Sequence, residues 1–228
     1  MEDFNPVRYA DMTTIRVSVF RAVPPFAQGL VRDLRVRWAL EEAGEAYSER
    51  VIGPEDQKSA SYRRLQPFGQ VPAYEEGDLV LFESGAIVHH IAQRSAALMP
   101  ADPAGRARVT AWMFAAMNSI EPQIQNLTAL DLFYAHEDWA KARRPGALAA
   151  VQQRLHDLAA ALGDRSYLEE GRFTAADLLM TTVLRIPRHT NIVAEIPVLD
   201  SYRLRCEARP AFQRALAAQM AVFERNAA

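Results

Sequence analysis

The sequence contains very little cysteine: Cys206 is the only one in 228 residues. A single cysteine cannot form an intramolecular disulfide, so a disulfide framework is excluded and a reducing compartment fits this usage. Long apolar runs are also missing, and the longest fall far short of the ~20 residues that a membrane-spanning helix needs. Residues 1–14 include three acidic side chains and no apolar central segment, which argues against a secretory signal. We therefore expect a polar N-terminal arm over residues 1–14 and a cytoplasmic protein.

An excess of charge of one sign is lacking as well. Lys and Arg number 26 and Asp and Glu 28, which gives a net charge of −2 without a long run of either sign. Neither nucleic acid nor an anionic membrane surface is therefore predicted as a partner. Half of the residues are apolar and 24% are charged, which is typical of a globular protein with a substantial core.

The first part of the chain alternates between strand and helix patterns. Strand patterns cover residues 15–20, 47–52, 71–75 and 79–83, and the last two form a hairpin. Helix patterns cover residues 26–43, 55–65 and 84–94, and Gly44 is the stop signal of the first helix. The predicted order over residues 15–98 is therefore β-α-β-α-β-β-α.

The pattern changes after residues 100–103, which contain two prolines and indicate a linker. Residues 104–228 show no strand pattern, and helices are predicted over 106–133, 145–162, 174–186, 198–208 and 210–225. Pro145 would stand in the first turn of its helix, where proline is tolerated. Thr174 and Asp177 have the spacing of a capping box, a structural device at a helix start. The predicted fold class is α+β, with a mixed N-terminal domain followed by an all-helical C-terminal domain.

The most specific chemistry lies in the predicted hairpin and the helix after it. Val71 precedes Pro72 in a turn, and a cis bond there would leave the backbone N–H and C=O of Val71 able to pair with an extended peptide. Glu83 and Ser84 stand where a strand runs into a helix. A carboxylate, a hydroxyl and free helix N–H groups at one point can hold an amino-acid head group. A peptide slot beside such a clamp is what glutathione needs.

Three stretches resemble the hallmark motifs of the cytosolic glutathione S-transferases: residues 67–72 (PFGQVP), 83–87 (ESGAI) and 173–177 (FTAAD). Residues 195–212 resemble that family's C-terminal helix pair, so the likeness runs from about residue 15 to residue 223. The resemblance implies a thioredoxin-like N-terminal domain, an all-helical C-terminal domain and a homodimer. It also implies a detoxification enzyme that transfers the thiolate of glutathione, its co-substrate, to a small hydrophobic electrophile, or one that reduces peroxides with glutathione.

The resemblance assigns roles to four residues of the hairpin region. Val71 would pair its backbone with the cysteinyl part of glutathione, and Pro72 would be the cis proline. Glu83 would lie near the γ-glutamyl ammonium and Ser84 on the γ-glutamyl carboxylate. The simpler alternatives are a strand-edge proline at Pro72 and a plain helix cap at Glu83 and Ser84.

Two further residues are candidates for the other end of glutathione. Lys58 lies 13 residues before Val71, at a position that contacts the glycyl carboxylate in omega-like members of the family. Gln70 is a second candidate there. A solvated surface lysine is an equally good interpretation of Lys58.

The side chain that activates the thiol in this family is missing. Between Ser18 and Tyr47 the chain has no Ser, Thr, Cys or Tyr. Residues 24–27 (PPFA) resemble the CPFA of omega-like members with Pro24 in place of the cysteine, whereas counting back from Gly44 puts the catalytic position at Leu30. Neither side chain can activate a thiol. The alternative function is therefore a non-catalytic glutathione-binding or assembly module, and a third is a binder of hydrophobic ligands.

Three substitutes for that side chain remain. The N-terminus of the first helix can stabilise a thiolate, Arg21, Gln28 or Arg32 can supply charge or a hydrogen bond, and Tyr9 can fold back from the N-terminal arm. Arg21 and then Gln28 are the first choices as catalytic residues, although an exposed loop arginine is the simpler interpretation of Arg21. Thiol exchange through Cys206 is not expected, because this residue lies in the helical half and is predicted to be a core thiol.

The electrophile pocket is expected between the first loop and the long helix, and its predicted lining is Phe26, Trp112, Met113 and Met117. Methionine and aromatic residues at helical spacing more often form a core than a pocket, and Phe26 is the better pocket candidate. The five histidines show no metal-ligand spacing, so no metal site is predicted.

Overall fold

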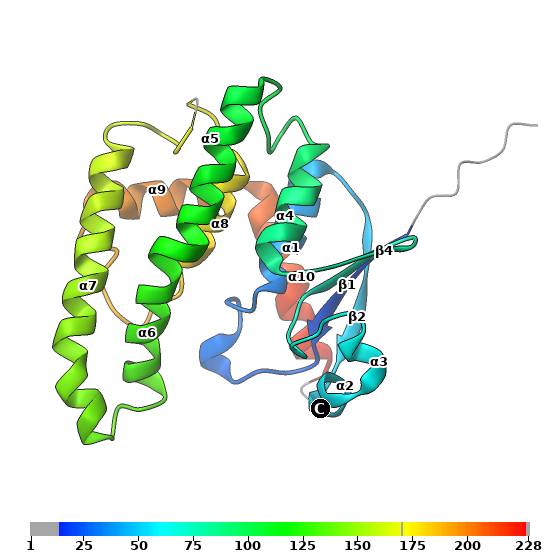
Figure 1. Cartoon of the computed structure of the whole chain (residues 1–228), viewed down its shortest axis with the longest axis horizontal. Helices are drawn as coiled ribbons and strands as arrows, with labels where there is room; N and C mark the ends of the chain where they lie inside the picture. The colour runs from blue at the N-terminus through cyan, green and yellow to red at the C-terminus, as the bar shows by residue number, and fades with distance from the viewer. Residues whose placement is uncertain (1–13, 170, 227–228) are drawn as a thin grey trace, which may run out of the picture.

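The computed structural model describes residues 14–169 and 171–226, which form a four-stranded sheet beside a larger group of helices (Figure 1). The elements of the first half are β1 (Ile15–Phe20), α1 (Asp33–Ala43), β2 (Tyr47–Ile52), α2 (Pro54–Lys58), α3 (Ala60–Arg63), β3 (Ala73–Glu76), β4 (Leu79–Phe82) and α4 (Ser84–Gln93). The helices of the second half are α5 (Pro103–Phe114), α6 (Glu121–Leu132), α7 (Asp138–Leu162), α8 (Ala175–Leu184), α9 (Pro197–Glu207) and α10 (Pro210–Arg225). The predicted α+β class, with a thioredoxin-like first half and a mainly helical second half, is confirmed.

The strands lie in the order β2-β1-β3-β4. β1 runs parallel to β2, with Ile15 opposite Tyr47, and antiparallel to β3. A parallel pair needs a crossover connection, which α1 provides, and the antiparallel β3–β4 pair needs only a tight turn. α1 contacts β1, and α4 contacts β4 and α1, so both helices bury their apolar sides at the sheet.

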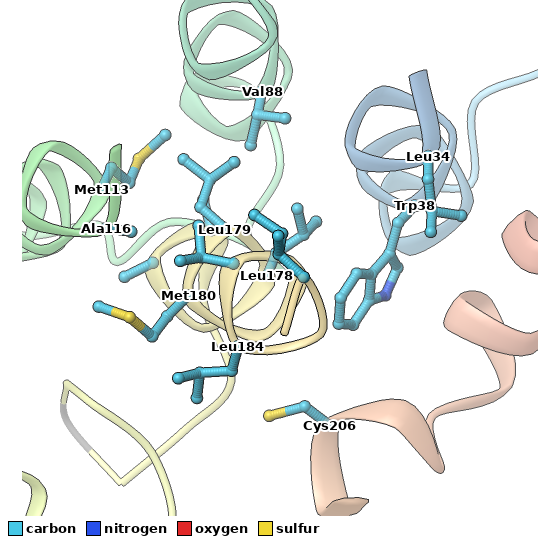
Figure 2. Close-up of a cluster of buried hydrophobic side chains, with 14 of the residues drawn as sticks. Leu34, Trp38, Val88, Met113, Ala116, Leu178, Leu179, Met180, Leu184 and Cys206 are labelled. Carbon is cyan, nitrogen blue, oxygen red and sulfur yellow. The ribbon is translucent and has the colours of Figure 1, made fainter. Parts of the chain in front are cut away.

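The core is centred on α8, all of whose residues are buried (Figure 2). A helix that is apolar on every side has to be enclosed by other elements, and here α1, α4, α5 and α9 contact it. Side chains from both halves of the chain therefore share one core; those labelled in Figure 2 are Leu34, Trp38, Val88, Met113, Ala116, Leu178, Leu179, Met180, Leu184 and Cys206. The prediction of a buried Cys206 is confirmed.

The caps behave as predicted. Gly44 ends α1 in the left-handed conformation, with φ of 71°. Thr174 and Asp177 form a complete capping box at the start of α8, and the Asp177 carboxylate also accepts hydrogen bonds from the Leu168 N–H and the Tyr202 hydroxyl. This carboxylate therefore ties α8 to the preceding loop and to α9, which is a structural role.

The first predicted helix, residues 26–43, is wrong at its start. Residues 25–27 form a single 3-10 turn and α1 begins only at Asp33. Gly29 has a φ of 76°, which belongs to no right-handed helix, and it separates the two segments. The helical spacing of Leu30 and Leu34 predicted a longer helix, because side-chain spacing carries no information about the backbone conformation of Gly29.

Three other predicted helices also differ from those in the structure. α7 begins at Asp138, so Pro145 lies inside the helix and not in its first turn; a helix can retain proline by giving up one hydrogen bond. The stretch 106–133 is interrupted by a π-helical segment, Ala115–Ile120, between α5 and α6. Residues 55–65 form two short helices that are separated at Ser59. None of the helices in the described ranges combines the length and the apolar character that crossing a membrane requires.

Candidate functional site

The register of the β3–β4 hairpin brings the two predicted halves of the site together. The Val71–Pro72 bond is cis, as predicted. Ala73 pairs with Phe82 across the antiparallel hairpin. In an antiparallel pair, a step back along one strand is opposite a step forward along the other. Pro72 and Val71 therefore lie beside the point where Glu83 leads into Ser84.

A buried hydrogen-bond chain fixes the backbone on both sides of Val71. The Ser18 hydroxyl accepts from the Ala73 N–H at 2.6 Å and lies 2.7 Å from the Tyr62 hydroxyl, which donates to the Gln70 carbonyl at 2.6 Å. Since Tyr62 uses its proton on Gln70, the Ser18 hydroxyl is the donor between the two side chains. Strand β1 and helix α3 thus hold the turn from both ends.

The backbone of Val71 itself has no hydrogen-bond partner among the residues that the structure describes. Its neighbours Gln70 and Ala73 are hydrogen-bonded, but no hydrogen bond joins the N–H or C=O of Val71 to another residue in the described part of the chain. Unpaired backbone groups beside a sheet edge can pair with an extended peptide. The peptide slot expected from the sequence stays a prediction, which this geometry permits.

The start of α4 lies beside that backbone and carries N–H groups without a partner in the helix. Glu83 has φ of 68° and ψ of 111°, a conformation that a residue with a side chain rarely adopts and that concentrates at functional sites. The first hydrogen bond of the helix runs from the Ile87 N–H to the Glu83 carbonyl. The N–H groups of Ser84 and Gly85 therefore have no partner within the helix, and the positive end of the helix dipole lies at the same point.

Ser84 is held from behind by a buried arginine. The Arg35 guanidinium is 3% exposed and donates to the Ser84 hydroxyl at 3.2 Å and to the Thr182 hydroxyl at 3.0 Å. It also contacts the Met117 sulfur at 3.2 Å and the Glu121 carboxylate at 3.0 Å. One side chain of α1 therefore connects the start of α4 with α8 and with the π-helical segment before α6.

Glu121 is the counter-ion of this arginine. It is buried and accepts from Arg35 through one oxygen and from Arg32 through the other at 2.7 Å. Burial opposes ionisation, but the two arginines outweigh it and hold the pKa of Glu121 below its usual value. Burial lowers the pKa of Arg35, whereas Glu121 acts in the opposite direction.

Lys58 and Gln70, the candidates for the glycyl carboxylate, are both exposed. Lys58 is the last residue of α2. The neighbouring Gln57 side chain donates to the Gly69 carbonyl at 2.8 Å, which ties the end of α2 to the loop that carries Gln70. Both side chains therefore belong to the same edge of the site.

The two candidate catalytic residues lie on opposite ends of the loop after β1. The Arg21 guanidinium is 3.2 Å from the Glu55 carboxylate and 3.9 Å from that of Asp56, so its charge faces the start of α2. Gln28 is half-buried beside the 3-10 turn, and its carbonyl accepts a hydrogen bond from Arg188 at 2.6 Å. Both remain predictions as catalytic residues, and Tyr9 lies outside the described residues.

A cleft of about 450 Å³ separates this loop from α6 and the end of α8; we call it the first cleft. It lies where Figure 1 shows the blue segment after β1 beside the lower end of α6. Its lining consists of Phe26, Ala27, Leu30, Val31, Gln125, Thr128, Leu132, Phe133, Ile186, Arg188 and His189. Of the residues predicted to line a pocket between loop and long helix, only Phe26 lies in it.

Met113 and Met117 line a different hollow, the second cleft, which has a volume of about 430 Å³ between α4 and α5. Trp112 is half-buried and packs against the core. Trp112 and Met113 belong to α5 and Met117 belongs to the π-helical segment Ala115–Ile120, whereas the first cleft is lined by residues of α6 that come later in the chain. A stripe of large side chains predicts that a helix face is covered, but the packing of other elements decides which hollow it faces.

The backbone at the start of α1 borders the first cleft. No hydrogen bond joins the N–H of Val31 or of Arg32 to any residue that the structure describes. Val31 lines the cleft, and Arg32 precedes the first residue of α1. Two free donors at the positive end of a helix favour an anion such as a thiolate.

Several residues of this arrangement were missed at the sequence level. Ser18 is a hydroxyl between two valines of β1, and Arg35 is a charged residue beside the apolar face of α1; both positions could have marked buried hydrogen-bonded groups. Tyr62 and Glu121 carry no such signal, because nothing local indicates that they are buried. Within the described ranges, no three His, Cys, Asp or Glu side chains lie close enough together to hold a metal ion.

Comparison with known proteins agrees with this geometry. A family model described as "Glutathione S-transferase, N-terminal domain" matches residues 28–93. A glutathione S-transferase of Hyoscyamus muticus is 32% identical over 173 residues, which are 71% of this chain and 80% of the relative. Glutathione S-transferase 3 of Zea mays is 30% identical over 202 residues, which are 81% of this chain and 88% of the relative.

Solved structures are similar over nearly the whole chain. The theta class glutathione S-transferase from Xanthomonas axonopodis pv. citri, with glutathione bound, superimposes with a TM-score of 0.75 at 31% identity. The match covers 90% of this chain and 98% of that one. Both sequence relatives are covered over most of their length, and the solved structure superimposes over 90% of this chain. The chain therefore belongs to the glutathione S-transferase family.

Proposed function

We propose that this protein is a glutathione transferase that binds glutathione at the β3–β4 edge and transfers its thiolate to a small hydrophobic electrophile in the first cleft. The observation that carries the proposal is the meeting of the unpaired Val71 backbone with the start of α4 at Glu83 and Ser84. The glutathione-bound structure of the Xanthomonas relative supports it.

Each part of the tripeptide has a complementary group in this proposal. The cysteinyl unit pairs with the Val71 backbone in the manner of an added strand. The γ-glutamyl carboxylate accepts hydrogen bonds from the Ser84 hydroxyl and the free N–H groups of α4, while Glu83 faces the ammonium. Lys58 or Gln70 binds the glycyl carboxylate.

The thiolate is stabilised in this proposal by the start of α1. The N–H groups of Val31 and Arg32 and the helix dipole lower the pKa of the glutathione thiol, with Arg21 and Gln28 as the candidate side chains. The thiol releases its proton to solvent, and the thiolate then forms a sulfur–carbon bond as a leaving group departs with its electron pair. Apolar walls of the first cleft exclude water around the electrophile.

The test is a titration of bound glutathione in which thiolate absorbance is followed against pH. We expect a thiol pKa well below that of free glutathione, and we expect Ser84→Ala to weaken binding by about 10- to 100-fold because it removes a hydrogen bond to a charged group. Arg21→Ala and Gln28→Ala then show whether either side chain contributes to the shift. Tight binding of glutathione without a lowered thiol pKa would refute the transferase mechanism.

The second candidate function is a non-catalytic glutathione-binding or assembly module. It is favoured by Leu30, which stands where a thiol-activating hydroxyl is expected and presents only an apolar side chain to the first cleft. Turnover separates the two functions: this module would bind glutathione without accelerating its addition to electrophiles or its oxidation by peroxides. Ligand binding that survives Ser84→Ala unchanged would instead favour a binder of hydrophobic ligands.

We further propose a cytoplasmic homodimer with a role in detoxification. Phe68 is 63% exposed on the loop before Val71, and the second cleft offers an apolar hollow between α4 and α5. An exposed aromatic residue and an apolar hollow on one chain suit a two-fold interface, because Phe68 of each copy can pack into the second cleft of the other. Sedimentation equilibrium should give the mass of two chains, and Phe68→Ser should shift it toward one.

A further inference from the structure

The first cleft combines apolar walls with an aromatic mouth. Phe26 and Phe133 lie edge to face with ring centroids 5.7 Å apart, although the two residues are 45% and 63% exposed. They come from the loop after β1 and from the end of α6. Two rings that are held together but left open to solvent provide a surface on which a third ring can pack.

The guanidinium of Arg188 lies at the rim of this apolar cleft. The Arg188 guanidinium donates through Nη2 to the Phe26 carbonyl at 2.9 Å and to the Gln28 carbonyl at 2.6 Å, which fixes it against the loop. Burial lowers the pKa of Arg188. Arg188 is exposed, and in the described part of the chain no carboxylate lies within ion-pairing distance of it.

The neighbouring charges leave this cation unopposed. His189 lies 3.2 Å from the Asp131 carboxylate, which Arg144 also binds at 2.6 Å. Asp131 is therefore already neutralised by its own partners. Arg185, beneath the loop, faces Glu207 at 3.5 Å, so that pair adds no net charge. An anion that enters the cleft meets the net positive charge of Arg188.

The wall of the cleft also contains an unused polar group. Thr128 is 8% exposed and lines the cleft, and its hydroxyl has no hydrogen-bond partner among the residues that the structure describes. A buried hydroxyl without a partner is unfavourable, but its oxygen is enclosed by protein atoms and adds nothing to the binding of a ligand in the cleft. Gln125, one turn away on α6, offers an amide nearby.

We propose that the first cleft selects aromatic electrophiles that carry an anionic group such as a carboxylate, and that Arg188 is the residue that binds this group. The ring packs against Phe26 and Phe133, and the anion pairs with the free N–H groups of Arg188. The inference rests on the proposed transferase function for its chemistry. A guanidinium fixed by two carbonyls is pre-organised for a carboxylate, whereas a neutral apolar ligand gains nothing from it.

The test compares two electrophiles that differ only in charge, 4-chloro-3,5-dinitrobenzoate and its methyl ester. In both reactions the glutathione sulfur bonds to the ring carbon and chloride leaves with the electron pair of the C–Cl bond. Each enzymatic kcat/KM is divided by the rate constant of the same reaction without enzyme. We expect the corrected value to be at least about 10-fold higher for the carboxylate, the discrimination that one charge-assisted hydrogen bond supplies.

Variants assign the effect to one side chain. Arg188→Gln should lower kcat/KM for the carboxylate by about 10- to 100-fold and leave the ester within about twofold, whereas Arg188→Lys should retain part of the preference. Arg214→Gln is the matched control, because this exposed arginine of α10 pairs with Glu41 away from the cleft. Equal losses for both electrophiles would mean that Arg188 only supports the loop, and would overturn the inference.

A binding measurement separates the inference from the proposed function. Calorimetry with the unreactive 3,5-dinitrobenzoate and its methyl ester needs no turnover. Tighter binding of the carboxylate that Arg188→Gln abolishes would support the anion site even if the protein transferred no thiolate. Equal affinity of the wild-type protein for the two compounds would refute it, whatever the result of the turnover assay.

Discussion

Replacing Arg35 with methionine should both destabilise the protein and weaken glutathione binding. Arg35 is 3% exposed and Glu121 4%, and their side chains meet at 3.0 Å. Removing one partner of a buried ion pair costs about 3–5 kcal/mol, because the other charge is left in the protein interior. At 228 residues each kcal/mol corresponds to about 2–4 °C. The expected fall in Tm is therefore about 6–20 °C.

Two variants divide this loss into its parts. Arg32→Met removes the half-exposed partner of the same carboxylate and should cost no more than about 1 kcal/mol. The double variant Arg35→Met/Glu121→Met removes both buried charges and should regain much of the stability lost in Arg35→Met, since apolar side chains can replace a buried pair at little cost.

Glutathione affinity should follow a different pattern from stability. The Ser84 hydroxyl loses its Arg35 donor in the single and in the double variant alike. The dissociation constant for glutathione, measured by calorimetry, should therefore stay raised by about 3- to 10-fold in the double variant, the equivalent of about one hydrogen bond. A double variant that is as unstable as the sum of its single changes, or that binds glutathione normally, would refute this account of Arg35.

Three further predictions concern Glu121, Tyr62 and Cys206. The pKa of Glu121 is lower in the folded chain than its usual value of 4.5, so its charge contributes stability at neutral pH that is lost as the pH falls through the folded pKa. The difference in unfolding free energy between wild type and Glu121→Gln, measured with urea, should therefore shrink below about pH 4.5. A difference that stays constant would contradict this. Tyr62→Phe removes the hydrogen bonds to Gln70 and Ser18, so it should cost about 1–2 kcal/mol in urea unfolding and weaken glutathione binding; unchanged affinity would show that the turn does not need them. Burial raises the pKa of Cys206 to about 12, so an aromatic disulfide reagent should react with it only as fast as the chain unfolds, whereas rapid labelling of the native protein would show that the thiol is accessible.

Local sequence patterns predicted the succession of elements and the two halves of the proposed glutathione site. Alternation in residues 15–20 and 47–52 and helical spacing after residue 104 are short-range signals, and they were sufficient for the α+β class. The Val71–Pro72 and Glu83–Ser84 stretches are short and contiguous, so their chemistry could be inferred without knowing what surrounds them. The start of α1 could not, because its late onset depends on the left-handed conformation of Gly29.

The sequence by itself therefore determined the fold class, the two short stretches at which glutathione binding is proposed, and the lack of Ser, Thr, Cys and Tyr between Ser18 and Tyr47. Only the tertiary structure decided which distant residues support the site: Ser18 and Tyr62 beneath the turn, and Arg35 with Glu121 behind Ser84. It also decided that Met113 and Met117 face the second cleft while Arg188 lies at the rim of the first. The physical reason is that propensity and hydrophobic period act over a few residues, whereas burial of a charge and its pairing depend on side chains that folding brings together from far along the chain.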